Sequence, residues 1–208
     1  MSSYTLKTNR PGYRCEADPE LNGRFGQKRT SGAAAAAVIN PGSTLSEKEN
    51  YPVIDVIKRQ EQALQFTSFD NDTALTIGCY IIEQAKADKV AVTVDVTVNR
   101  NLLFFHAMAG TSPNNIDWIR RKSNLVNRTG HASFYTHIVA INNGQDFDNL
   151  STFDPKDFAA HGGSFPIILK GTGQIGTITV SGLTGVDDHA MAVRALKWYL
   201  KQSEVPLN

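Results

Sequence analysis

The sequence of 208 residues lacks most features that would place it in a specialised class. It has only two cysteines, Cys15 and Cys79, too few for a disulfide framework or a cysteine-based metal site. No apolar run approaches the ~18 residues that a membrane span needs, and the N-terminal stretch lacks the apolar segment of a signal peptide. These absences predict a cytoplasmic protein with no membrane partner.

An excess of one charge is also missing. The chain has 21 Lys and Arg against 20 Asp and Glu, which leaves a net charge of +1. This balance argues against nucleic acid as the main partner, because nucleic-acid-binding domains carry a clear basic excess. The length suits one domain with a complete core.

The first 45 residues differ in composition from the rest. They are rich in Gly, Ser, Pro and charge, with an alanine run at 33–37, and show neither strand alternation nor a helical stripe. We therefore predict an N-terminal arm at 1–45 and a folded domain at 46–208.

Hydrophobic periodicity predicts four helices in the domain. The first spans Ser46–Gln62, the second opens at Asp70, the third begins at the Thr111-Ser112-Pro113 signal, and the last follows a capping box at Thr184. A short helical or irregular piece is expected from His131 to Ile141. The third and last helices have these predicted buried residues: Ile116, Ile119 and Val126; Val186, Ala190, Val193, Leu196 and Leu200.

Alternation predicts two strand pairs. Valines alternate with smaller or polar residues along Lys89–Asn99, and Leu102–Met108 runs back after an Asn-Arg-Asn turn. Ser164–Leu169 and Ile175–Val180 form the second pair. Since hairpins join the strands, the predicted fold is α/β of the α+β type, with helices packed on an antiparallel sheet.

Several motifs occur together in one order. They are Val94-Asp95-Val96, Trp118-Ile-Arg-Arg-Lys122, Gly130-His-Ala-Ser-Phe-Tyr135, Ala160-His-Gly-Gly-Ser-Phe-Pro166 and Gly176-Thr-Ile-Thr-Val-Ser-Gly182 followed by Asp188. Over roughly residues 46–201 the chain resembles the heme-degrading-domain family of the GlcG and HbpS proteins. The resemblance implies a profilin-like sandwich with about five antiparallel strands, a homo-oligomer, and heme or another tetrapyrrole as a cofactor to test.

Three histidines in these motifs, His131, His161 and His189, are the candidate catalytic or ligand-binding groups. Imidazole can ligate iron or move protons near neutral pH. None has the spacing of a metal site, so no metal is predicted, and a structural hydrogen bond from each ring is the alternative.

Eight further residues are candidates for ligand binding. A lone carboxylate on a strand must be paired, hydrated or functional, basic residues can hold an anion, aromatic rings can stack on a planar ligand, and paired glycines let backbone approach a ligand. The alternatives are an ion pair of the carboxylate with Lys122 or Arg121, a solvated helix face, a core contact and a tight turn. The candidates are Asp95, Trp118, Arg120, Arg121, Lys122, Tyr135, Gly162 and Gly163.

Three hypotheses for function follow. The first is an oligomeric cytosolic protein that binds a small anionic or planar ligand, such as a tetrapyrrole, near the three histidines. The second is an enzyme in which one histidine acts as general acid or base while Arg120 or Lys122 holds a substrate carboxylate. The third is an assembly protein whose N-terminal arm reaches a neighbouring subunit.

Overall fold

A computed structural model describes residues 47–207, with side chains from residue 53 onward. The predicted arm at 1–45 lies outside the described residues, so that boundary stays a prediction. The helices are α2 (Glu47–Ala63), α3 (Asn71–Asp88), α4 (Pro113–Thr129), α5 (Ser133–Asn142) and α6 (Gly185–Leu200), with a short 3-10 helix η1 (Phe147–Asn149). The strands are β1 (Thr93–Val98), β2 (Asn101–Ala107), β3 (Ser164–Leu169) and β4 (Gly173–Ser181).

Local capping explains where two helices begin. The Asp70 carboxylate accepts a hydrogen bond from the backbone N–H of Thr73 (2.8 Å), and the Thr184 hydroxyl accepts one from the N–H of Asp187 (3.2 Å). These bonds satisfy N–H groups that have no partner inside the helix. Both predicted helix starts are confirmed, and the uncertain piece after His131 is the regular helix α5.

The sheet is antiparallel, as predicted, in the order β2-β1-β4-β3. Among the described residues it has four strands, against the five that the resemblance implied. Beside β3, Phe66 forms a single parallel bridge to Leu169, with hydrogen bonds from Phe66 N–H to Ile168 O (2.8 Å) and from Lys170 N–H to Phe66 O (2.9 Å). One extended residue therefore occupies the place of a fifth strand.

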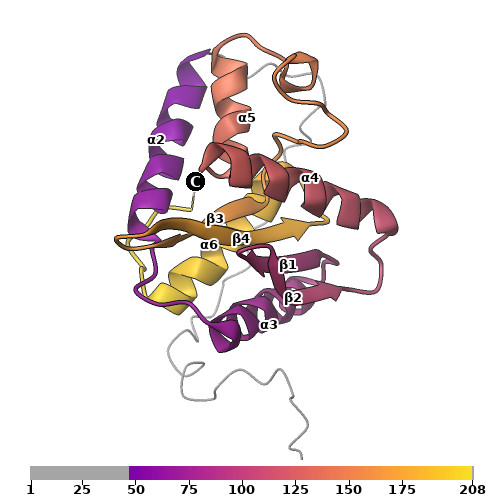
Figure 1. Cartoon of the computed structure of the whole chain (residues 1–208), viewed down its shortest axis with the longest axis vertical. Helices are drawn as coiled ribbons and strands as arrows, with labels where there is room; N and C mark the ends of the chain where they lie inside the picture. The colour runs from indigo at the N-terminus through magenta and orange to yellow at the C-terminus, as the bar shows by residue number, and fades with distance from the viewer. Residues whose placement is uncertain (1–46, 208) are drawn as a thin grey trace, which may run out of the picture. The chain divides into compact units, whose positions relative to one another are not determined.

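The two faces of the sheet differ in chemistry. Val94 and Val96 lie opposite Val180 and Ile178 on an apolar face, which α3 and α6 cover (Figure 1). The other face carries hydroxyls and one carboxylate, and α4 covers it (Figure 1). We call this set the polar layer: Thr93, Asp95, Thr97, Ser164, Thr177, Thr179 and Ser181.

Three predictions of burial were wrong. Ile116 and Val186 were expected in the core but are 47% and 44% exposed, because each lies in the first turn of its helix, at the edge of the packed region. Lys122 was expected on an outer helix face but is only 3% exposed, since α4 turns it toward the polar layer. Of the described helices, none is apolar over enough residues to traverse a bilayer.

Candidate functional site

A groove opens where the β1–β2 turn, the C-terminal half of α4 and the start of β4 meet. Its volume is about 640 Å³, within the roughly 300–1,000 Å³ range of small-ligand sites. We call it the hairpin groove. It is lined by Thr97, Asn99, Arg100, Asn124, Asn127, Arg128, Phe158, Gln174, Ile175 and Gly176.

Two arginines give the hairpin groove its positive charge. Within the described chain neither Arg100 nor Arg128 has a carboxylate within ion-pair distance, and no acidic residue lines the groove. The Arg128 guanidinium lies 5.3 Å and 5.5 Å from the ring centroids of Phe153 and Phe158, which hold it in place by cation–π contact. The groove therefore has two positive charges available for an anion.

Amide side chains complete the wall. The Gln174 amide nitrogen donates to the Asn127 side-chain oxygen (3.2 Å) and to the Gly176 carbonyl (3.3 Å), while the Asn124 amide nitrogen donates to the Asp157 carbonyl (3.0 Å). These bonds orient the amides before any ligand arrives. Such fixed donors and acceptors favour a polar ligand over an apolar one.

Asp95 lies on the polar layer directly behind this wall. Its carboxylate accepts a hydrogen bond from the hydroxyl of Thr97, which lines the groove (2.9 Å). Burial raises the pKa of Asp95 to about 6, and the Thr97 hydrogen bond opposes that rise. The predicted ion pair of Asp95 with Lys122 or Arg121 does not form, because Lys122 is bound to Asp188 and Arg121 to Asp117.

The three candidate histidines have separate surroundings. His131 pairs with Glu61 (2.8 Å) and lies against the Tyr135 ring, whereas His189 is buried against Phe134 and Phe165. None of the three lines the hairpin groove. The shared histidine pocket that the sequence suggested is thus not this groove.

His161 lies in a different aromatic cluster. Its ring contacts the edge of Trp118 at 4.9 Å and stacks on His137 at 5.4 Å between centroids. Burial lowers the pKa of both His137 and His161, so both rings are neutral at pH 7. His137 was missed as a candidate because it lies outside the motifs.

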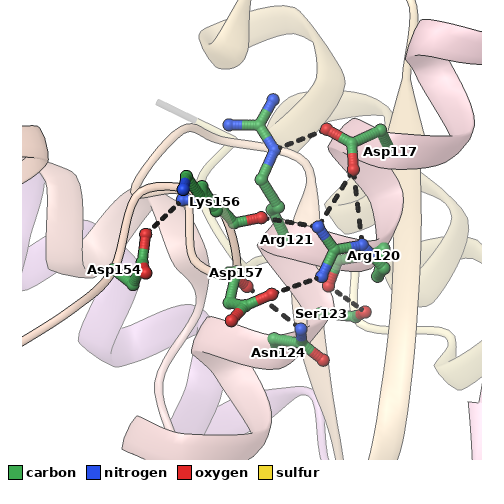
Figure 2. Close-up of polar contacts among 8 residues, drawn as sticks. All are labelled: Asp117, Arg120, Arg121, Ser123, Asn124, Asp154, Lys156 and Asp157. Carbon is green, nitrogen blue, oxygen red and sulfur yellow. Dashed lines mark hydrogen bonds and ion pairs between the residues drawn. The ribbon is translucent and has the colours of Figure 1, made fainter.

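The basic cluster on α4 is already neutralised by carboxylates. Figure 2 shows Arg120 between Asp117 (3.0 Å) and Asp157 (2.9 Å), with Arg121 bonded to the second oxygen of Asp117 (2.8 Å). Arg121 also covers the Trp118 ring, 4.0 Å from its centroid. These arginines therefore tie α4 to the loop before β3, and their charge is not free for a ligand.

Lys122 forms a buried ion pair with Asp188 at the start of α6 (2.9 Å) and also donates to the Val180 carbonyl (3.3 Å). Asp188 in turn accepts from the Leu183 N–H (3.0 Å). Burial lowers the pKa of Lys122 and raises that of Asp188, while each partner's charge opposes these shifts. The pair joins α4 to α6.

Gly162 and Gly163 are required by packing within the chain. A Cβ on Gly162 would lie 1.9 Å from the Gly185 carbonyl oxygen. A Cβ on Gly163, whose φ is +126°, would lie 2.4 Å from the Val180 oxygen and 2.8 Å from the Lys122 ammonium. The tight-turn alternative for these glycines agrees with this geometry, since the close approach is made by protein backbone.

Iron and other metals can be tested against the described residues. The hairpin groove has no His, Cys, Met or Tyr in its lining, so it does not fit a heme held by such an axial ligand. No group of three or more His, Cys, Asp or Glu in the described part of the chain is arranged to hold a metal ion. The chemistry that the groove does fit is recognition of an anion by guanidinium and amide groups.

Comparison with known proteins identifies relatives of this chain. Residues 69–197 match the family described as "Haem degrading protein HbpS-like". A UPF0303 protein of Azotobacter vinelandii is 42% identical over 149 residues, which cover 72% of this chain and 90% of that protein.

Two solved structures share the fold. The crystal structure of Ybr137w matches with a TM-score of 0.68 and 25% identity, covering 76% of this chain and 93% of that one. A PduOC:heme complex matches with a TM-score of 0.52 and 19% identity, over 63% and 93% of the two chains.

Proposed function

This chain belongs to the HbpS-like family, and we propose on that premise that it binds a small anionic ligand in the hairpin groove. The observation that carries the proposal is the pair Arg100 and Arg128. Both line one groove, and neither has a carboxylate partner in the described chain. Uncompensated guanidinium groups that share a polar concavity are the arrangement by which proteins hold carboxylates and phosphates.

The geometry favours this function over acid–base catalysis by a histidine. The enzyme hypothesis needs Arg120 or Lys122 to hold a substrate carboxylate, but Arg120 is bonded to two aspartates and Lys122 to Asp188. Freeing either charge would cost an existing ion pair. Binding in the hairpin groove requires no such exchange.

The test is calorimetric titration with citrate and with inorganic phosphate at low salt, where exposed charges are weakly screened. Arg100→Gln and Arg128→Gln should each weaken binding about tenfold, since a hydrogen bond to a charged group contributes about 1.5–3 kcal/mol and this groove is open to solvent. Arg194→Gln is the matched control, because Arg194 is an exposed arginine paired with Asp88 away from the groove. Equal binding by all four proteins, or no binding by any, would overturn the proposal.

The tetrapyrrole form of the hypothesis can be tested with the same proteins. A PduOC:heme complex shares this fold, and a neutral His161 has a ring nitrogen able to ligate iron. Hemin should then give a shifted Soret band that disappears in His161→Ala or His131→Ala. No shift at stoichiometric hemin would remove heme as the ligand.

Self-association is part of the proposal. β2 is an edge strand whose Leu102 and Phe105 are 55% and 41% exposed, and its sequence contains no proline, lysine or acidic residue. Edge strands of monomeric proteins usually carry such residues to block pairing with another chain. Their absence supports a homo-oligomer that buries β2.

A further inference from the structure

One side chain of the hairpin groove has its hydrogen-bonding role set by a neighbour. Thr97 is the hydroxyl-bearing residue in the lining, and its Oγ1 lies 2.9 Å from a carboxylate oxygen of Asp95. Asp95 does not itself line the groove. It therefore acts on a ligand through Thr97.

A hydroxyl has one proton to donate and two lone pairs. An ionised carboxylate has only lone pairs, so the Thr97 hydroxyl must donate its proton to Asp95. The oxygen of Thr97 then has only lone pairs left for the groove. At this point the wall accepts a hydrogen bond and cannot offer one.

The surroundings of Asp95 leave this arrangement to Asp95 alone. Its cross-strand neighbours are Phe105 on β2 and Thr179 on β4, neither of them charged at neutral pH. Charged or titratable groups on the adjoining elements either face away or are engaged elsewhere, and none of them shifts the titration of Asp95. They are His106, which pairs with Val94 on the apolar face, Lys122, which is bound to Asp188, and the groove residues Arg100 and Arg128.

We propose that Thr97, oriented by Asp95, is a specificity-determining residue, which selects an anion that also carries a hydroxyl or amine donor over the same anion without that donor. This inference rests on the proposed anion-binding function of the groove. The arginines supply attraction for any anion, and Thr97 supplies the discrimination. The ligand class is thus a hydroxy- or amino-substituted carboxylate or phosphate.

The selectivity should depend on pH. The pKa of Asp95 is raised to about 6 by burial, so the carboxyl is mainly ionised at pH 7.5 and mainly protonated at pH 5.0. A protonated Asp95 can donate to Thr97, which frees the Thr97 proton for the groove. The preference for a donor on the ligand should therefore weaken at pH 5.0.

The experiment compares citrate with tricarballylate, two tricarboxylates that differ by one hydroxyl. At pH 7.5 the wild-type protein should bind citrate about 3- to 10-fold more tightly, the effect of one net hydrogen bond. Thr97→Val and Asp95→Asn should bring this ratio close to one, while Thr97→Ser should keep it. The ratio at pH 5.0 should fall in the wild type and stay unchanged in Thr97→Val.

Thr177→Val is the matched control. Thr177 lies directly opposite Thr97 on β4, does not line the groove, and has a buried hydroxyl with no partner in the described chain. The same substitution there should leave the citrate preference intact. If Thr177→Val abolishes the ratio as Thr97→Val does, the effect is general damage to the sheet and the inference is wrong.

Two failures can be told apart. If the wild type binds both tricarboxylates equally and Arg128→Gln weakens both, the groove binds anions but Thr97 selects nothing, and only this inference fails. If neither binds, the proposed function fails and the inference falls with it.

Discussion

The buried His189 makes a quantitative prediction about acid stability. Its side chain is 2% exposed, and its Nε2 lies 2.8 Å from the Oε1 of Gln60. The Gln60 amide is oriented by its own donors, because its Nε2 bonds the carbonyls of Pro206 (2.9 Å) and Leu207 (3.1 Å). Gln60 therefore offers an acceptor, so the neutral imidazole carries its proton on Nε2.

Protonation would have to occur on the other ring nitrogen. The Nδ1 atom of His189 is buried and has no hydrogen-bond partner in the described chain, and the rings of Phe134 and Phe165 lie alongside. A charge there would be neither solvated nor paired. Burial accordingly lowers the pKa of His189 to about 3.

The unfolded chain takes up a proton that the native protein does not. With an unfolded pKa near 6.5, stability is retained above that pH and is lost as pH falls toward 3. Between pH 7.5 and 5.0 the free energy of unfolding should drop by about 2 kcal/mol from this residue alone. Histidines such as His137 add further losses of the same sign.

Urea unfolding of the wild type and His189→Gln at the two pH values isolates the effect of this residue. The variant should be less stable at pH 7.5, but it should lose about 2 kcal/mol less on acidification. His106→Gln, at an exposed histidine of β2, should lose as much as the wild type. Parallel losses in the wild type and His189→Gln would refute the assignment of a buried neutral ring.

Two other predictions concern the ion pair and the sheet edge. Asp188→Ala should lower the free energy of unfolding by about 3–5 kcal/mol in urea, because it strands the Lys122 charge in the core, whereas the exposed neighbour Asp187→Ala should cost at most ~2 kcal/mol as the loss of a helix cap. Similar costs for both would contradict the buried pair. Phe105→Glu should reduce the mass measured by light scattering, and an unchanged oligomer would show that β2 is not the interface.

The parts of the fold that local sequence determines were predictable. Strict valine alternation located β1, and the caps at Asp70 and Thr184 located two helix starts, because each signal is contained within a few residues. The HbpS-like resemblance supplied the sheet architecture that these local signals do not encode. Phe66 shows the limit, since its parallel bridge to Leu169 depends on segments about a hundred residues apart.

The burial of α4 was harder to predict for a physical reason. A helix that packs on an apolar surface shows an apolar stripe, but α4 packs on hydroxyls and a carboxylate. Lys122 can be buried there only because Asp188, 66 residues away, supplies the opposite charge. No local pattern around Lys122 contains that information.

The candidate site was predicted less well than the fold. Attention fell on histidines and on the arginines of one motif, yet Arg120 and Arg121 turned out to be paired with Asp117. The unpaired arginines lie elsewhere, Arg100 in a turn and Arg128 at the end of α4. Whether a charge is compensated depends on residues distant in sequence, so sequence alone could not separate the two kinds of arginine.

The polar layer connects these observations. A sheet face covered by a helix gains most stability from apolar side chains, yet here it carries Asp95 and the unpartnered buried hydroxyls of Thr93 and Thr177. Burying such groups costs stability, so packing does not account for them. The layer ends at the hairpin groove, where Thr97 belongs to both. A polar interior that leads to a positively charged groove is expected if the side chains behind the wall control hydrogen bonding at its surface, which is the role inferred for Asp95.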